Sequence, residues 1–92
     1  MTRAHIWVKG RVQGVAFRAH VEYYALQIKV AGWVQNVGYD TVETVAEGSP
    51  ERIERFIATV KQGPRAARVD EARVEHETFT GEFEGFVVKR SV

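Results

Sequence analysis

Residues 4–28 read AHIWVKGRVQGVAFRAHVEYYALQI, and within this stretch the apolar pattern changes from that of a strand to that of a helix. At the start, apolar residues alternate along one face of a strand: Ala4, Ile6 and Val8. After a short loop they recur at spacings of four, four and three, as one helical stripe: Phe17, Val21, Ala25 and Ile28. The stretch predicts a strand to about Val12, with Gly10 at a bulge or close backbone approach, and a helix from Phe17 to about Lys29.

The middle of the chain predicts a hairpin and a second helix. Residues 33–47 read as two strands joined by a turn at 38–40. Ser49 is then suited to cap a helix, and Pro50 to occupy its first position. An apolar i, i+3, i+4, i+7 stripe follows, and Gly63-Pro64 ends the helix.

The last third adds a charged strand over 67–76, which should be exposed on one face, and a short strand over 86–90. The order β-α-β-β-α-β, followed by one terminal strand, predicts an α+β fold. We expect a ferredoxin-like (split βαβ) sandwich, in which two helices cover one face of an antiparallel sheet of four to five strands. The chain of 92 residues shows no linker, so residues 1–92 should form a single domain.

Composition narrows the classes of function. The net charge is +1, with both signs spread along the chain, which argues against a dedicated nucleic-acid or membrane binder. The chain has no cysteine, so disulfides, thiolate catalysis and cysteine-based metal sites are excluded. The N-terminus lacks the apolar run of a signal peptide or membrane span. These features favour a cytoplasmic protein with no nucleic-acid and no membrane partner.

The loop between the first strand and the first helix is the best candidate for a binding site. Such a junction directs several backbone N–H groups into one concavity, and the helix N-terminus adds partial positive charge. Arg18, in the first helical turn, can bind two phosphate oxygens at once. The residue six positions before it is Val12, which is no nucleophile, so direct attack by water is the simpler mechanism. The loop alone is also compatible with an ordinary turn followed by a solvated arginine, because a glycine-rich loop is weak evidence for phosphate binding.

Other polar and aromatic residues carry weaker signals. Asn36 ends the second strand and is either a turn residue bonded to its own backbone, which is the commoner case, or an amide that orients a water. The histidines have no paired ligand spacing and favour structural or exposed positions over a metal site: His5, His20 and His76. Five aromatic side chains are expected in the core rather than on a stacking platform: Trp7, Phe17, Trp33, Phe56 and Phe86.

Residues 10–18 resemble the signature G-x-V-Q-G-V-x-F-R of the acylphosphatase family. Residues 32–36 and 42–43 are similar to the family segment G-W-V-x-N followed by V-E. Residues 63–69 resemble G-P-x-x-A-x-V, and residues 85–88 look like the family's last strand. The resemblance covers essentially the whole chain, and the first motif is specific.

The resemblance implies an acylphosphatase, which hydrolyses acyl phosphates to a carboxylate and inorganic phosphate. It implies that Arg18 binds the substrate phosphate and that Asn36 positions the attacking water. The phosphate-binding loop would supply backbone N–H donors together with Arg18: Gln13, Gly14, Val15, Ala16 and Phe17. The family uses no metal and no organic cofactor, and we expect a monomer.

Alternative functions come from the same fold. A nonenzymatic phosphate-binding or regulatory acylphosphatase-like module is the main one, because such domains occur attached to larger proteins. A chain that stands alone and begins with methionine favours a free enzyme. An RNA-recognition module would need paired aromatic residues on the two central strands, whereas strand one offers only Trp7.

Two departures from the family pattern bear on geometry. Residues 38–41 read Gly-Tyr-Asp-Thr where the family usually has an Asp-Gly turn. Lys29 stands near the end of the first helix, where the family often has glycine. A lysine resists a left-handed cap, so this helix is expected to end differently.

Overall fold

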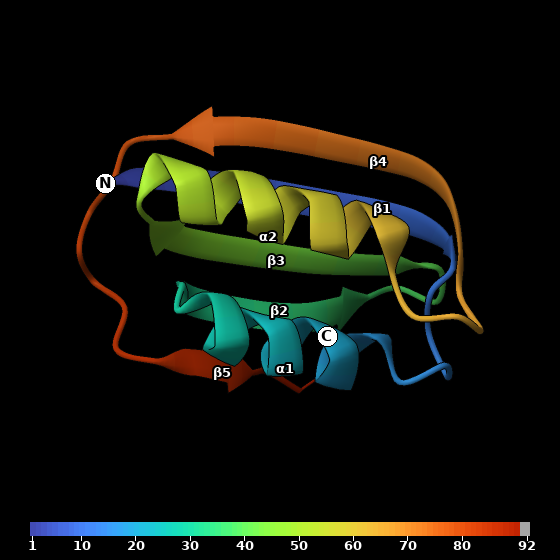
Figure 1. The fold of residues 1–92 in the computed structure, drawn as a ribbon. Coiled ribbons are helices and arrows are strands. Elements are labelled where there is room, and N and C mark those ends of the chain that lie inside the picture. The colour runs from blue at the N-terminus through green and yellow to red at the C-terminus, as the bar shows by residue number, and fades with distance from the viewer. Residues whose placement is uncertain (91–92) are drawn as a thin grey trace.

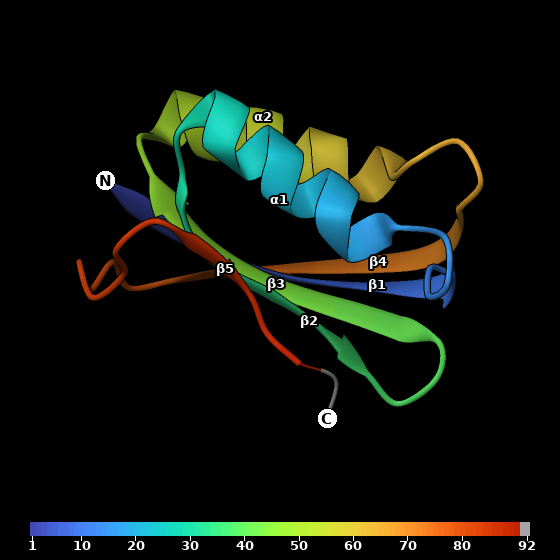
Figure 2. The same ribbon diagram turned by 90° about the horizontal axis from the view of Figure 1, so that it is seen from below.

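Within residues 1–90, two helices lie side by side on one face of a five-stranded sheet (Figure 1), and the opposite face of the sheet carries no helix (Figure 2). The computed structural model describes residues 1–90. Its elements are β1 (Thr2–Arg11), α1 (Phe17–Ile28), β2 (Ala31–Val37), β3 (Thr41–Gly48), α2 (Pro50–Gln62), β4 (Arg68–Glu77) and β5 (Phe86–Val88). The predicted ferredoxin-like α+β fold is confirmed.

The strands lie in the order β4-β1-β3-β2-β5. Neighbours among the first four strands pair antiparallel, as expected from the sequence. The short β5 pairs parallel to β2, with Gly32 opposite Phe86, so the complete sheet is mixed. This parallel edge brings the C-terminal segment alongside the strand that carries Asn36.

The core fills the space between the helices and the sheet. The alternating residues of β1 and the predicted stripe of α1 are all buried: Ala4, Ile6, Val8, Phe17, Val21, Ala25 and Ile28. Phe56 and Phe86 join this core, as predicted, with their ring centroids 5.9 Å apart. Full burial of such a side chain contributes about 1.5–3 kcal/mol, so the two stripes hold the helices on the sheet.

The prediction that Trp7 and Trp33 lie in the core is wrong. Successive residues of a strand point to opposite faces of the sheet. Trp7 and Trp33 each alternate with the buried residues of their strand, so both project from the face that no described helix covers. Trp7 stacks on His5, with ring centroids 3.7 Å apart, and the Arg73 guanidinium lies 4.0 Å from the centroid of the Trp7 ring. The Lys89 ammonium lies 4.3 Å from the centroid of the Trp33 ring. One cationic side chain therefore lies over each of these two indole rings on the uncovered face.

The expectation for the end of α1 is also wrong. Lys29 adopts the left-handed conformation, with φ 69° and ψ 52°, and donates its N–H to the Ala25 carbonyl at 2.8 Å. A left-handed non-glycine residue costs roughly 1–2 kcal/mol. The turn also delivers Val30 into the core, and burying a valine contributes about 1.5–3 kcal/mol. Burial of Val30 therefore offsets the strain at Lys29.

Gly10 lies at a β-bulge, as predicted. The register between β1 and β4 shifts between Lys9 and Gly10, where φ is 141°. A Cβ here would lie 2.3 Å from the Arg68 carbonyl oxygen, so the close approach needs glycine. The Gly10 N–H donates to the Asp40 carbonyl at 3.0 Å and joins the end of β1 to the hairpin tip.

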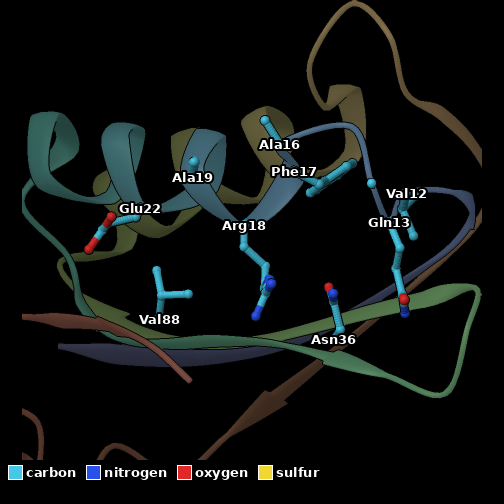
Figure 3. A pocket seen from close by; sticks show the side chains of 10 residues that line it. Val12, Gln13, Ala16, Phe17, Arg18, Ala19, Glu22, Asn36 and Val88 are labelled. Atoms are coloured by element: carbon cyan, nitrogen blue, oxygen red, sulfur yellow. The ribbon is translucent and has the colours of Figure 1, made fainter. Parts of the chain in front are cut away.

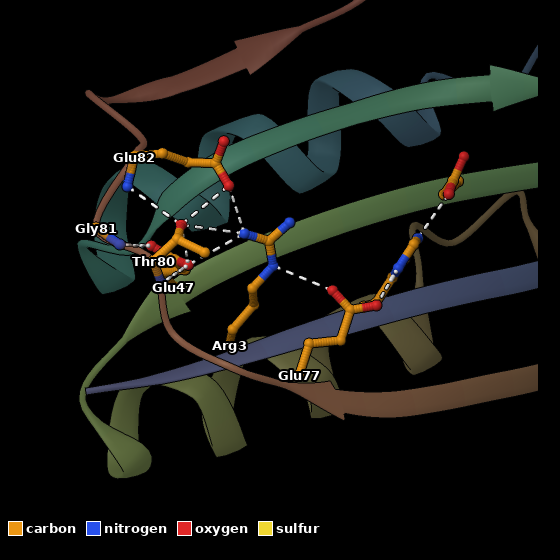
Figure 4. Close-up of polar contacts among 8 residues, drawn as sticks. Arg3, Glu47, Glu77, Thr80, Gly81 and Glu82 are labelled. Atoms are coloured by element: carbon orange, nitrogen blue, oxygen red, sulfur yellow. Dashed lines mark hydrogen bonds and ion pairs between the residues drawn. The ribbon is translucent and has the colours of Figure 1, made fainter.

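The buried carboxylate of Glu47 holds the crossover between β4 and β5 (Figure 4). Glu47 is 4% exposed and accepts hydrogen bonds from the Thr80 N–H at 2.9 Å, the Thr80 hydroxyl at 3.0 Å and the Gly81 N–H at 3.0 Å. Arg3 donates to the same carboxylate at 3.3 Å. Because residues 78–85 make no strand of their own, these bonds determine how the chain returns to β5.

Burial raises the pKa of Glu47, but hydrogen bonds from Thr80, Gly81 and Arg3 outweigh it and hold that pKa below its ordinary value of 4.5. A carboxyl whose pKa is depressed on folding stabilises the protein above its unfolded pKa. That contribution is lost as the pH falls through the folded pKa. The crossover should therefore weaken in acid, below about pH 4.5.

Glu47→Gln should lower the free energy of unfolding by about 1–3 kcal/mol at neutral pH. In the parent, both carboxylate oxygens of Glu47 accept hydrogen bonds from N–H groups of the crossover. Glutamine would replace one of these oxygens with an NH₂ group, which is a donor and cannot accept such a bond. The difference from the parent should be smaller at about pH 3, because the contribution of the parent carboxyl is lost as the pH falls through its folded pKa, which lies below 4.5. Urea unfolding at both pH values measures this, with the exposed Glu54→Gln as the control expected to change stability by less than about 0.5 kcal/mol. An equal loss at both pH values would contradict the electrostatic role of Glu47.

Candidate active site

A pocket of about 410 Å³ opens where the loop after β1, the first turns of α1, strand β2 and the edge strand β5 meet (Figure 3). Six of the seven residues singled out from the sequence line it: Gln13, Gly14, Ala16, Phe17, Arg18 and Asn36. The seventh, Val15, is partly buried and packs against the core, so it anchors the loop to the rest of the fold. The fold therefore brings the signature loop and Asn36 into one cavity.

The N-terminus of α1 has no side-chain cap. Ala16, the residue before the helix, has φ 60° and ψ 30°, and Gly14 has φ 73°. The first hydrogen bond of the helix runs from the His20 N–H to the Ala16 carbonyl at 3.0 Å. The N–H groups of residues 17–19 precede that bond and have no helical acceptor. They add donors and a partial positive charge to the pocket.

Helix α2, which lies away from the pocket, differs from α1 in having a side-chain cap at its N-terminus. There the Ser49 hydroxyl accepts from the Arg52 N–H at 3.3 Å, and Glu51 places an acidic side chain in the first turn. Helix α1 has no acidic residue in its first turn. The start of α1 is thus open to an external anion.

Arg18 points from α1 across the pocket towards Asn36 (Figure 3). One guanidinium nitrogen donates to the Lys89 carbonyl at 3.1 Å, just beyond β5, which fixes the orientation of the side chain. Within residues 1–90 Arg18 forms no ion pair. A guanidinium has five N–H donors, so most of them are left for a ligand.

Asn36 lies within β2, opposite Val42 of β3, and its amide points into the pocket (Figure 3). In the described part of the chain this amide makes no hydrogen bond to its own backbone or to another side chain. It can both donate and accept. The side chain is therefore available to a ligand or water between it and Arg18.

Gln13 has a second part in the site, which the sequence does not reveal. Its side-chain amide donates to the carbonyls of Thr41 at 3.0 Å, Gly38 at 3.2 Å and Val37 at 3.4 Å. These carbonyls belong to the tip of the hairpin that carries Asn36. Gln13 therefore joins the loop to the hairpin, and the unusual Gly-Tyr-Asp-Thr turn stays attached to the site.

Sequence reasoning missed four residues that line the pocket: Val12, Ala19, Glu22 and Val88. Glu22 lies four residues after Arg18, and this helical spacing is a signal that could have found it. Val88 and the Lys89 carbonyl come from the far end of the chain. Only the parallel pairing of β5 with β2 brings them to the pocket, and no local pattern indicates that pairing.

His20 lies within α1 but does not line this pocket. Burial lowers the pKa of His20 below its usual value. Its ring contacts Phe17 and Tyr24, with centroid distances of 6.2 Å and 4.9 Å. Among residues 1–90 no group of three or more histidine or acidic side chains is arranged to hold a metal ion. No helix in this part of the chain is long and apolar enough to span a membrane.

Comparison with known proteins gives a consistent result. The acylphosphatase family model matches residues 4–88. A protein named acylphosphatase from Pelotomaculum thermopropionicum is 45% identical over 86 residues, which are 94% of each chain. The crystal structure of acylphosphatase from Bacillus subtilis matches with a TM-score of 0.92 at 35% identity, over 97% of this chain and 99% of that one. T.kodakarensis HypF matches with a TM-score of 0.83 at 36% identity, over 97% of this chain but 12% of its own.

Gln13→Ala should loosen the site without unfolding the sheet, because it removes the amide that joins loop and hairpin. We expect the free energy of unfolding to fall by about 1–3 kcal/mol and amide exchange to accelerate at 13–16 and 38–41. Hydrogen exchange followed by NMR measures both segments. Gln35→Ala is the matched control, since its amide binds Glu43 instead, at 2.8 Å. Unchanged exchange at both segments in Gln13→Ala would contradict the joining role.

Proposed function

This chain belongs to the acylphosphatase family, and we propose that a water held by Asn36 attacks phosphorus directly while Arg18 and loop N–H groups hold the phosphate. The chain is a hydrolase of acyl phosphates, which it converts to a carboxylate and inorganic phosphate. In the proposed mechanism, binding of the phosphate and orientation of the water fall to different residues.

One observation carries the proposal: an arginine without an ionic partner within residues 1–90 shares a pocket with an uncapped helix N-terminus. A phosphate group brings negative charge and several acceptor oxygens, which complement these donors. We assign phosphate binding to Arg18 and to the main-chain N–H groups of residues 13–17. Donors preorganised towards developing charge typically contribute about 3 kcal/mol each to lowering the barrier.

Asn36 lies across the pocket from Arg18, on a rigid strand. An amide that both donates and accepts can hold a water in line with the bond to be broken, which is an orientational effect. Val12, six positions before Arg18, is fully buried and aliphatic, so no covalent intermediate forms there. The phosphoryl group passes through a loose transition state with charge on its equatorial oxygens.

The leaving group explains why the loop needs no acid or base. A carboxylate is stable as it departs, so the reaction needs no strong general acid. Residues 13–18 contain no aspartate, glutamate or histidine. In the proposed mechanism the water's proton passes to a phosphate oxygen of the substrate, and Asn36 needs only to orient the water.

The proposal includes the setting in which the reaction takes place. We assign the activity to a monomer made of one domain over residues 1–92, working in the cytoplasm with no nucleic-acid or membrane partner. Arginine and main-chain N–H groups can together balance the phosphate charge. Hydrolysis should therefore need no metal and no organic cofactor, and a chelator should leave it unchanged.

The alternative is a module that binds phosphate without hydrolysing it, in the manner of a regulatory domain. The match to a small part of T.kodakarensis HypF shows this fold inside a longer chain. A hydrolysis assay with benzoyl phosphate, with and without chelator, separates the two. Phosphate release in both conditions supports the enzyme, whereas binding without release by the folded protein would favour the module.

Asn36→Ala should lower kcat by about 100-fold or more while leaving inorganic phosphate affinity within about twofold of the parent. The variant loses the group that orients water and keeps the donors that bind phosphate. Gln35→Ala, its neighbour on the other face of β2, serves as the control and should retain kcat. In water labelled with heavy oxygen, the label should enter inorganic phosphate. Weak phosphate binding with normal kcat, or label in the carboxylate, would contradict this mechanism.

A further inference from the structure

The pocket extends beyond the place assigned to phosphate. Past Arg18 it is lined by Ala19 and Glu22 of α1 and by Val88 of β5. Figure 3 shows Glu22 and Val88 on one side of Arg18, and Asn36 and Gln13 on the other. Glu22 lies four positions after Arg18 along α1, which is a rise of about 6 Å. A substrate that places its phosphate at the loop therefore has room for its acyl group beside Glu22.

Glu22 is half-buried at this end of the pocket, which it lines together with the aliphatic side chains of Ala19 and Val88. Within residues 1–90 its carboxylate forms neither an ion pair nor a hydrogen bond. The i, i+4 spacing would allow Arg18 to pair with it, but the Arg18 guanidinium donates to the Lys89 carbonyl instead. Glu22 therefore brings a carboxylate, unpaired within the described chain, to this end of the pocket, on the side away from Arg18 (Figure 3).

We propose that Glu22 is a specificity-determining residue that selects acyl phosphates by the charge of the acyl group. Acyl groups that are neutral or carry an ammonium are accepted, and those with a second carboxylate or phosphate are disfavoured. Two like charges a few ångströms apart repel, and partial burial weakens screening by water. The inference rests on the proposed phosphate site at Arg18, because that site fixes which end of the substrate meets Glu22.

A positioning role for Glu22 makes a different prediction. If the carboxylate acted by orienting Arg18, its removal would change turnover of every substrate alike. A charge filter changes the ratio between substrates and leaves the neutral one unaffected. Comparison of substrates that differ only in charge therefore separates the two roles.

The test compares kcat/KM for three aromatic substrates of similar shape: benzoyl phosphate, para-carboxybenzoyl phosphate and para-(aminomethyl)benzoyl phosphate. In Glu22→Gln, kcat/KM should rise about fivefold for the anionic substrate and fall by a similar factor for the cationic one. The neutral substrate and inorganic phosphate inhibition should stay within about 1.5-fold of the parent. Glu54→Gln changes the net charge equally on exposed α2 and should leave all three values unchanged.

Each outcome decides between the two roles. Opposite shifts for the two charged substrates, diminished by added salt, support the charge filter. An unchanged ratio in Glu22→Gln, with the neutral substrate still hydrolysed, overturns this inference and leaves the proposed function standing. An equal loss on all three substrates overturns it in favour of positioning. A folded parent that hydrolyses none of the three overturns the proposed function and this inference together.

Discussion

The site depends on one unsatisfied requirement of the backbone: the first turn of α1 has N–H donors with no helical acceptor and no side-chain cap. In α2 the same requirement is met within the chain, by Ser49. Leaving it unmet at α1 costs stability in the free protein and creates affinity for an anion. Arg18 adds a full positive charge to the same place. In the proposed mechanism, the phosphate of an acyl phosphate supplies the acceptors that these N–H groups lack.

The rest of the fold serves to hold these donors against two distant segments. The bulge at Gly10 and the side chain of Gln13 join the loop to the hairpin that carries Asn36. The carboxylate of Glu47 fixes the crossover that returns β5 to the sheet edge. Beyond β5, the Lys89 carbonyl orients Arg18. Residues from both ends of the chain therefore determine the geometry of one pocket.

Local sequence patterns predicted the elements well, because their causes are local. The stripe of α1, the cap at Ser49 and the bulge at Gly10 each follow from a few neighbouring residues. The errors came from tertiary effects. Trp7 is large and aromatic, yet its parity in β1 directs it to the uncovered face of the sheet. Lys29 takes a left-handed conformation because the burial of Val30 compensates the strain. The bonds of Gln13 and the arrival of Val88 depend on long-range pairing, which no short motif encodes.

The central claim is that Arg18 and the N–H groups at the start of α1 bind one phosphate together. NMR titration of the amide-labelled protein with inorganic phosphate tests it most directly. We predict saturable shifts of the amides at 13–19, and an affinity at least about tenfold weaker in Arg18→Ala, with the exposed Arg52→Ala as the control. Shifts confined to other segments, or parent-like affinity in Arg18→Ala, would contradict it.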